Sequence, residues 1–234
     1  MSLERQFKNL PINDVYLSDD NPRINTTVRQ RQSSTDNFNP GSDRDRDQML
    51  LSRFLIKPAT KKLELDIIKA GGIQTPVDVE EVDGRYVVFE GNTRTAIYKK
   101  LYAEDTQKWA EIPAFIYPNI TLIEKKLMLN REHPQGKRQW DPYETAQEWK
   151  KQKEIGIDLN TISRSSGKSE LDVQRAINTI NLMDKHYKPY LLEAGETIDD
   201  HKDKYNHFLQ ILISDKQQKA LEKHNINIKE YSKL

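Results

Sequence analysis

The spacing of hydrophobic positions changes along the chain, and the change predicts strands with helices in the first half and helices alone in the second. Residues 10–17 alternate apolar and polar side chains, the pattern of a short strand with one buried face. Asp83-Gly84 predicts a hairpin between two further strands, because glycine accepts the positive φ of a tight turn. The strands expected from these patterns cover residues 10–17, 75–82, 85–90 and 111–118.

Helical spacing accounts for most of the other hydrophobic positions. Helices are expected over 47–56, 60–70 and 93–105, and beyond residue 120 the strand signals disappear. One of the later helices opens with a complete start signal, Asp141 as N-cap followed by Pro142 at the first helical position. We therefore expect an α+β fold with a small α/β domain over 1–120, a helical domain over 121–190 and a helical C-terminal extension over 191–234.

The stretch between the first strand and the first of these helices has no hydrophobic period. It is rich in Ser, Asn, Asp and Arg. Such a composition is typical of a solvated loop, so residues 24–48 are expected to form a long loop insert.

Composition and charge limit the classes of protein that the chain can belong to. Charged residues make up 31% of the 234 residues, and the formal net charge is +1, so any nucleic-acid surface has to be a local patch. The sequence has no cysteine, which excludes disulfides, thiolate metal sites and cysteine nucleophiles. No stretch reaches the roughly 18 apolar residues that cross a bilayer, and no signal-peptide pattern opens the chain, so we expect a cytoplasmic protein with no membrane partner.

The junction over residues 86–100 has the order strand, glycine, helix. The first backbone N–H groups of a helix lack internal partners and carry partial positive charge, and Gly91 before them would let a ligand approach. Arg94 in the first turn offers a planar donor fork that suits phosphate oxygens. The alternative is an ordinary strand-to-helix junction with a surface arginine.

A second candidate site lies over residues 159–183. Two helices are predicted on either side of Gly167, and Ser169 caps the second, which buries Val173 and Ile177 on one face. This is the plan of a helix-turn-helix, whose second helix enters the major groove of DNA. The alternative is a plain helical hairpin. The residues expected to contact DNA are Arg164, Lys168, Ser169, Gln174, Arg175 and Asn178, where glutamine and asparagine suit adenine and arginine suits guanine.

The stretch 63–101 resembles the N-terminal domain of the ParB family, which shares its fold with sulfiredoxin. Gly72-Ile73-Gln74-Thr75-Pro76 matches the family's Gly-Ile/Val-x-x-Pro element. Gly91-Asn92-Thr93-Arg94 matches its Gly-Glu-Arg-Arg motif and keeps the glycine and the last arginine. Asn21-Pro22-Arg23 is similar to a shortened Asn-Pro segment near the start of that domain, and the Pro142–Ala146 helix and the predicted helix-turn-helix follow in the family's order.

The resemblance implies that the first domain binds a nucleotide, CTP or ATP with Mg²⁺. The family's Asn that helps to hold the metal matches Asn130, although Leu129 stands where the family has glutamate and Thr93 where it has arginine. The sulfiredoxin activity is excluded because its cysteine has no counterpart. The residues expected at the nucleotide are Gly72, Gln74, Thr75, Glu90, Gly91, Asn92, Thr93, Arg94, Asn130 and Arg131.

Three functions are consistent with this resemblance. The first is a ParB-like DNA-binding protein in DNA partitioning, mobile-element maintenance or phage defence in a bacterium or phage, with a second copy and a partner ATPase or another partition or defence protein as partners. The second is a ParB-like nuclease or nucleotide-dependent phosphotransferase, in which His133 would be an acid–base group rather than an ordinary loop histidine. The third is a degenerate pocket that serves only protein interaction.

Overall fold

The chain divides into two units, one from Met1 to Lys125 and one from Lys126 to Leu234. The computed structural model describes residues 4–33, 38–39, 44–132 and 141–222. The division lies five residues after the boundary expected near 120, and residues 191–222 belong to the same unit as the helices before them. None of the helices within these described ranges has the length and apolar character needed to span a membrane.

The first unit is built on a mixed sheet of five strands in the order β1-β5-β3-β4-β2. β1 and β5 pair antiparallel, as do β3 and β4, whereas β3–β5 and β4–β2 are parallel. The predicted hairpin turn is confirmed, since Asp83 and Gly84 have φ of 52° and 74°. The strands are β1 (Gln6–Pro11), β2 (Val15–Leu17), β3 (Val77–Val82), β4 (Arg85–Glu90) and β5 (Glu111–Tyr117).

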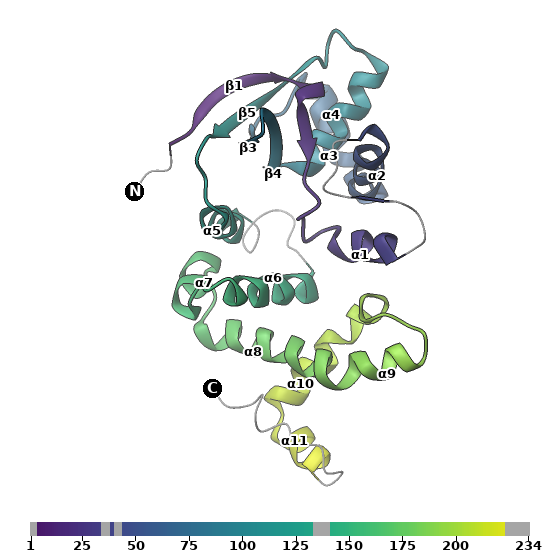
Figure 1. The fold of residues 1–234 in the computed structure, drawn as a ribbon, viewed down its shortest axis with the longest axis vertical. Coiled ribbons are helices and arrows are strands. Elements are labelled where there is room, and N and C mark those ends of the chain that lie inside the picture. The colour runs from purple at the N-terminus through teal and green to yellow at the C-terminus, as the bar shows by residue number, and fades with distance from the viewer. Residues whose placement is uncertain (1–3, 34–37, 40–43, 133–140, 223–234) are drawn as a thin grey trace. The chain divides into compact units, whose positions relative to one another are not determined.

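Helices cover one face of this sheet (Figure 1). The buried core joins the inward residues of the strands, such as Val79 and Val88, to Ile97 and Leu101 of α4 and Ile67 of α3. The helices of this unit are α1 (Asn25–Ser33), α2 (Asp45–Leu55), α3 (Lys61–Ala70) and α4 (Asn92–Glu104), with short 3-10 turns at Ile12–Asp14 and Pro58–Thr60.

In its described residues, the segment expected to be a loop insert over 24–48 is mostly helical, so that prediction was wrong for this part. It contains α1 and the start of α2, and it contributes Ile24, Val28 and Phe38 to a second core with Leu51 of α2. The rings of Phe38 and Phe54 meet edge to face at 5.9 Å between centroids. Its apolar residues are too few and too widely spaced among polar ones to form a readable period, yet each of these three is buried.

The second unit is all helical in its described part. The predicted cap of α6 is confirmed, because the Asp141 side chain accepts a hydrogen bond from the Tyr143 backbone N–H at 2.9 Å. Tyr143, Ile162, Val173 and Ile180 form the centre of its core. The helices are α5 (Leu122–Glu132, which begins in the first unit), α6 (Pro142–Glu154), α7 (Leu159–Ser166), α8 (Glu170–Leu182), a π-helix (Met183–Tyr187), α9 (Lys188–Glu193), a 3-10 segment (Ile198–Lys204), α10 (Tyr205–Ile213) and α11 (Asp215–Glu222).

Gly91 determines how α4 leaves β4. It is the N-cap of α4 with φ of 97°, a left-handed conformation that L side chains rarely adopt. A Cβ placed there would lie 2.6 Å from Cγ1 of Val77, inside the van der Waals contact distance. Both the backbone conformation and the packing against β3 therefore require glycine at this position.

Gly91→Ala is expected to lower the free energy of unfolding by about 2–4 kcal/mol, from left-handed strain and overpacking together. Gly84→Ala is the matched control, because Gly84 has φ of 74° but nothing within 4 Å of an added Cβ. This control should lose only the strain, about 1–2 kcal/mol. Urea unfolding followed by tryptophan fluorescence measures both, and equal losses would contradict the packing role of Gly91.

Phe38→Ala is expected to lower the free energy of unfolding by about 3–5 kcal/mol, because it removes a buried ring from the second core. The control Met49→Ala, on the exposed side of α2, should change it by no more than about 0.5 kcal/mol. The same urea unfolding experiment applies. A Phe38→Ala protein as stable as the control would mean that the segment before α2 is a solvated loop after all.

Candidate nucleotide and DNA sites

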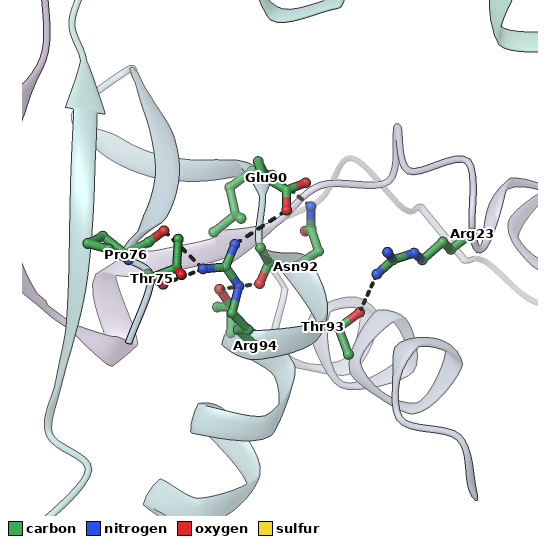
Figure 2. Close-up of polar contacts among 10 residues, drawn as sticks. Arg23, Thr75, Pro76, Glu90, Asn92, Thr93 and Arg94 are labelled. Carbon is green, nitrogen blue, oxygen red and sulfur yellow. Dashed lines mark hydrogen bonds and ion pairs between the residues drawn. The ribbon is translucent and has the colours of Figure 1, made fainter. Parts of the chain in front are cut away.

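Arg94 is bound to the protein itself in this structure. Its Nη1 donates to the backbone carbonyl oxygens of Thr75 and of Pro76, the latter at 3.0 Å, and its Nη2 lies 3.3 Å from Oε1 of Glu90 (Figure 2). The guanidinium therefore ties the first turn of α4 to the chain that enters β3. The expected contact of Arg94 with a phosphate stays a prediction, and it would require these bonds to be exchanged.

The first residues of α4 are covered by a segment from the start of the chain. Asn92 is 3% exposed, and its Oδ1 accepts from the Ser18 backbone N–H at 2.9 Å while its Nδ2 donates to the Val88 carbonyl at 3.2 Å. Nη1 of Arg23 lies 3.5 Å from Oγ1 of Thr93. Figure 2 draws this contact between the two side chains. Arg23 is thus a second arginine at this helix end, and the Asn-Pro-Arg signal could have placed it in the candidate site.

Two carboxylates lie beside this helix end. Asp78 of β3 is paired in register with Glu90 of β4. The pKa of Asp78 is raised to about 6: burial is the main cause and the charge of Glu90 adds to it, while a hydrogen bond from Tyr117 and the charges of Arg94 and Arg5 act in the opposite direction. The positive charge of Arg94 is therefore partly neutralised, so an anion at the α4 N-terminus would depend more on the backbone N–H groups and on Arg23.

The loop before β3 meets the same helix. The Ile73 backbone N–H donates to the Tyr98 hydroxyl at 3.1 Å, and a Cβ on Gly72 would lie 3.2 Å from that oxygen. Gln74 and Thr75 are exposed. The structure thus brings the predicted residues of 72–75 and 90–94 together around the first turns of α4.

Asn130 lies in the helical unit, where both its amide nitrogen and its amide oxygen form hydrogen bonds within the unit. It is 1% exposed; its Nδ2 donates to Oε1 of Gln152 at 2.8 Å and to Oγ of Ser165 at 2.9 Å, and its Oδ1 accepts from Nε2 of Gln152 at 3.1 Å. Asn130 in this conformation does not fit the expected role of a Mg²⁺ ligand. Arg131 is exposed, and His133 lies outside the described residues.

No group of three or more histidine, aspartate or glutamate side chains is arranged to hold a metal ion within the part of the chain that the structure describes.

The second candidate site is the pair α7 and α8, which are joined by Gly167–Ser169. Gly167 ends α7 with φ of 67°, and Oγ of Ser169 caps α8 by accepting from the Asp172 backbone N–H at 3.1 Å. Arg164, Lys168 and Ser169 are exposed. The short turn and the exposed start of α8 leave the predicted phosphate-contacting residues open to solvent.

The solvent-exposed face of α8 includes fewer of the predicted residues than expected. Gln174 and Arg175 are partly exposed, whereas Asn178 is 7% exposed and accepts a hydrogen bond from Nε2 of Gln174 at 2.6 Å. The expectation that Asn178 lies on the open face was wrong. Helical spacing places it one turn after Gln174, but the side chain is covered by the unit.

Comparisons with known proteins place the fold. No protein-family model matches the chain, and no relative was found among curated proteins. A Pnob8-like ParB-N domain is similar in structure, with a TM-score of 0.52 and 16% identity over 95% of this chain and 85% of that one.

Two structures of the C-terminally truncated chromosome-partitioning protein ParB from Caulobacter crescentus are more distant. The one complexed to the centromeric parS site has a TM-score of 0.44 and 15% identity, over 96% of each chain. The one complexed with CTP-γ-S has a TM-score of 0.28 and 16% identity, over 95% of this chain and 99% of that one. From the likeness to the ParB-N domain together with the mixed sheet, the chain has a ParB-like fold.

Proposed function

We propose that this protein is a ParB-like DNA-binding protein that contacts DNA through α7 and α8 and binds a nucleotide, CTP or ATP, at the N-terminus of α4. Its role would be in DNA partitioning, mobile-element maintenance or phage defence in the cytoplasm. A second copy and a partner ATPase or defence protein would be its partners. The observation that carries the proposal is the pair α7–α8, with its three-residue turn and exposed basic residues, in a chain with a ParB-like fold.

DNA binding is supported by the chemistry around the turn. Arg164 near the end of α7 and Lys168 in the turn are exposed cations that can bind phosphates and fix the register of a duplex. The start of α8 is exposed and presents polar side chains that can reach base edges. Because Glu170 and Asp172 are exposed at the same end, the net positive charge is small and we expect salt-sensitive binding of moderate strength.

Nucleotide binding is supported by the geometry of the α4 N-terminus. The first N–H groups of a helix favour an anion, and Arg23 supplies a charged fork from the opposite side, over Thr93. A bound triphosphate would take the place of the weak Arg23–Thr93 contact. Arg94 would act mainly by holding the carbonyl groups of Thr75 and Pro76, which fixes the loop on the other side of the site.

The combined variant Arg164→Ala and Lys168→Ala is expected to weaken DNA binding and to reduce the slope of log K against log salt concentration by about 2, because each lost phosphate contact removes about 0.9. Fluorescence anisotropy with a labelled duplex at several salt concentrations measures this. The matched control removes two exposed lysines of α3, Lys62→Ala and Lys69→Ala. DNA binding through α7–α8 is refuted if the wild-type protein binds no duplex. It is also refuted if the control variant loses as much of the salt-dependence slope as the combined Arg164→Ala and Lys168→Ala variant does.

Arg23→Ala is expected to weaken binding of CTP or ATP about tenfold or more, because it removes a charge-assisted hydrogen bond to phosphate. Isothermal titration calorimetry with CTP, ATP and GTP measures the affinity. Arg53→Ala, an exposed arginine of α2, is the control and should bind as wild type does. Wild-type protein that binds none of the three nucleotides would exclude the nucleotide half of the proposal and leave the DNA half standing.

A further inference from the structure

Gln174 is the one of the two candidate adenine readers that faces outward, and its amide is held on both sides. Its Oε1 accepts from Nζ of Lys153 at 3.1 Å, and its Nε2 donates to Oδ1 of Asn178 at 2.6 Å. Lys153 comes from the end of α6, outside the α7–α8 pair. Leu171, one turn earlier on α8, is 40% exposed, so this side of the helix is open to solvent at its start.

The lysine decides which way the amide points. A lysine ammonium can only donate hydrogen bonds, so the Gln174 atom that faces it has to be the carbonyl oxygen. Without such a partner, the oxygen and nitrogen of a glutamine amide exchange places by rotation about the last side-chain bond, and the rotation is broad. Lys153 and Asn178 together therefore select one orientation of the amide.

The held amide retains the groups that a base contact needs. The carbonyl oxygen has two lone pairs and the NH₂ group two hydrogens, so one acceptor and one donor remain after the bonds to Lys153 and Asn178. An acceptor beside a donor in one plane matches the N6 donor and N7 acceptor of adenine in the major groove. Holding a side chain in the binding orientation before binding reduces the entropy lost on recognition.

We propose that Gln174 reads an adenine in the major groove and that Lys153 is a positioning residue that sets the orientation of its amide. This inference rests on the proposed DNA binding through α7–α8. It assigns Asn178 the same positioning role, in place of a base contact. Lys153 thus contributes to specificity, as distinct from a phosphate-binding lysine, which would strengthen binding to every sequence alike.

The first step of the test is selection of a preferred duplex from a random library by the wild-type protein. Each adenine of that duplex is then replaced in turn by 7-deazaadenine, which lacks the N7 acceptor. At one position the wild type is expected to lose about tenfold in affinity, within the range for a bidentate base contact. For Gln174→Ala, replacing the adenine at that position by 7-deazaadenine should cause no loss of affinity.

The variants of Lys153 separate positioning from phosphate binding. Lys153→Met should lose most of the 7-deazaadenine effect, and Lys153→Arg should restore it because arginine also only donates. The inference is overturned if Lys153→Met weakens binding to all duplexes equally and still shows the full loss of affinity on 7-deazaadenine replacement. It is also overturned if Gln174→Ala keeps the wild-type base preference. Wild-type protein that binds no DNA overturns the proposed function itself, whereas selective binding unaffected by Gln174→Ala overturns this inference alone.

Discussion

The left-handed backbone at Gly91, packed against Val77, is the constraint on which the arrangement of the first unit depends. It sets the direction in which α4 leaves the sheet, and that direction brings Arg94 within reach of two backbone carbonyls before β3. The same direction places the N-terminus of α4 against the segment that carries Ser18 and Arg23. A glycine at a strand-to-helix junction is usually explained by the close approach of a ligand. At Gly91, a methyl group of Val77 occupies the space that a side chain would fill.

The helical unit has a different kind of constraint, a buried polar layer. Nζ of Lys126 lies 2.9 Å from Oε1 of Glu148, and Gln152 bonds both to that carboxylate and to Asn130. The two partners of the ion pair are 5% and 1% exposed. Losing one partner of a buried ion pair or hydrogen bond would leave the other group buried and unpaired, which is costly. These bonds therefore hold the second half of α5 against α6 in one register.

Local signals in the sequence predicted local features well. The Asp83-Gly84 turn and the Asp141-Pro142 helix start depend on adjacent residues only, and both are present. The packing of Phe38 against Phe54 and the capture of Arg94 by a carbonyl 18 residues earlier in the chain depend on tertiary contacts, which no local period encodes. The burial of Asn178 was missed for the same reason, whereas the resemblance to ParB, a pattern spread over many elements, predicted the fold.

We propose that a nucleotide binds at the N-terminus of α4, beside the segment 18–24. Hydrogen–deuterium exchange of the 234-residue chain with and without CTP, ATP or GTP tests it most directly, because it locates binding without assuming which residues take part. The account predicts that one nucleotide slows exchange in residues 18–24 and 91–95. Unchanged exchange in both segments, or protection confined to other parts of the chain, would contradict it.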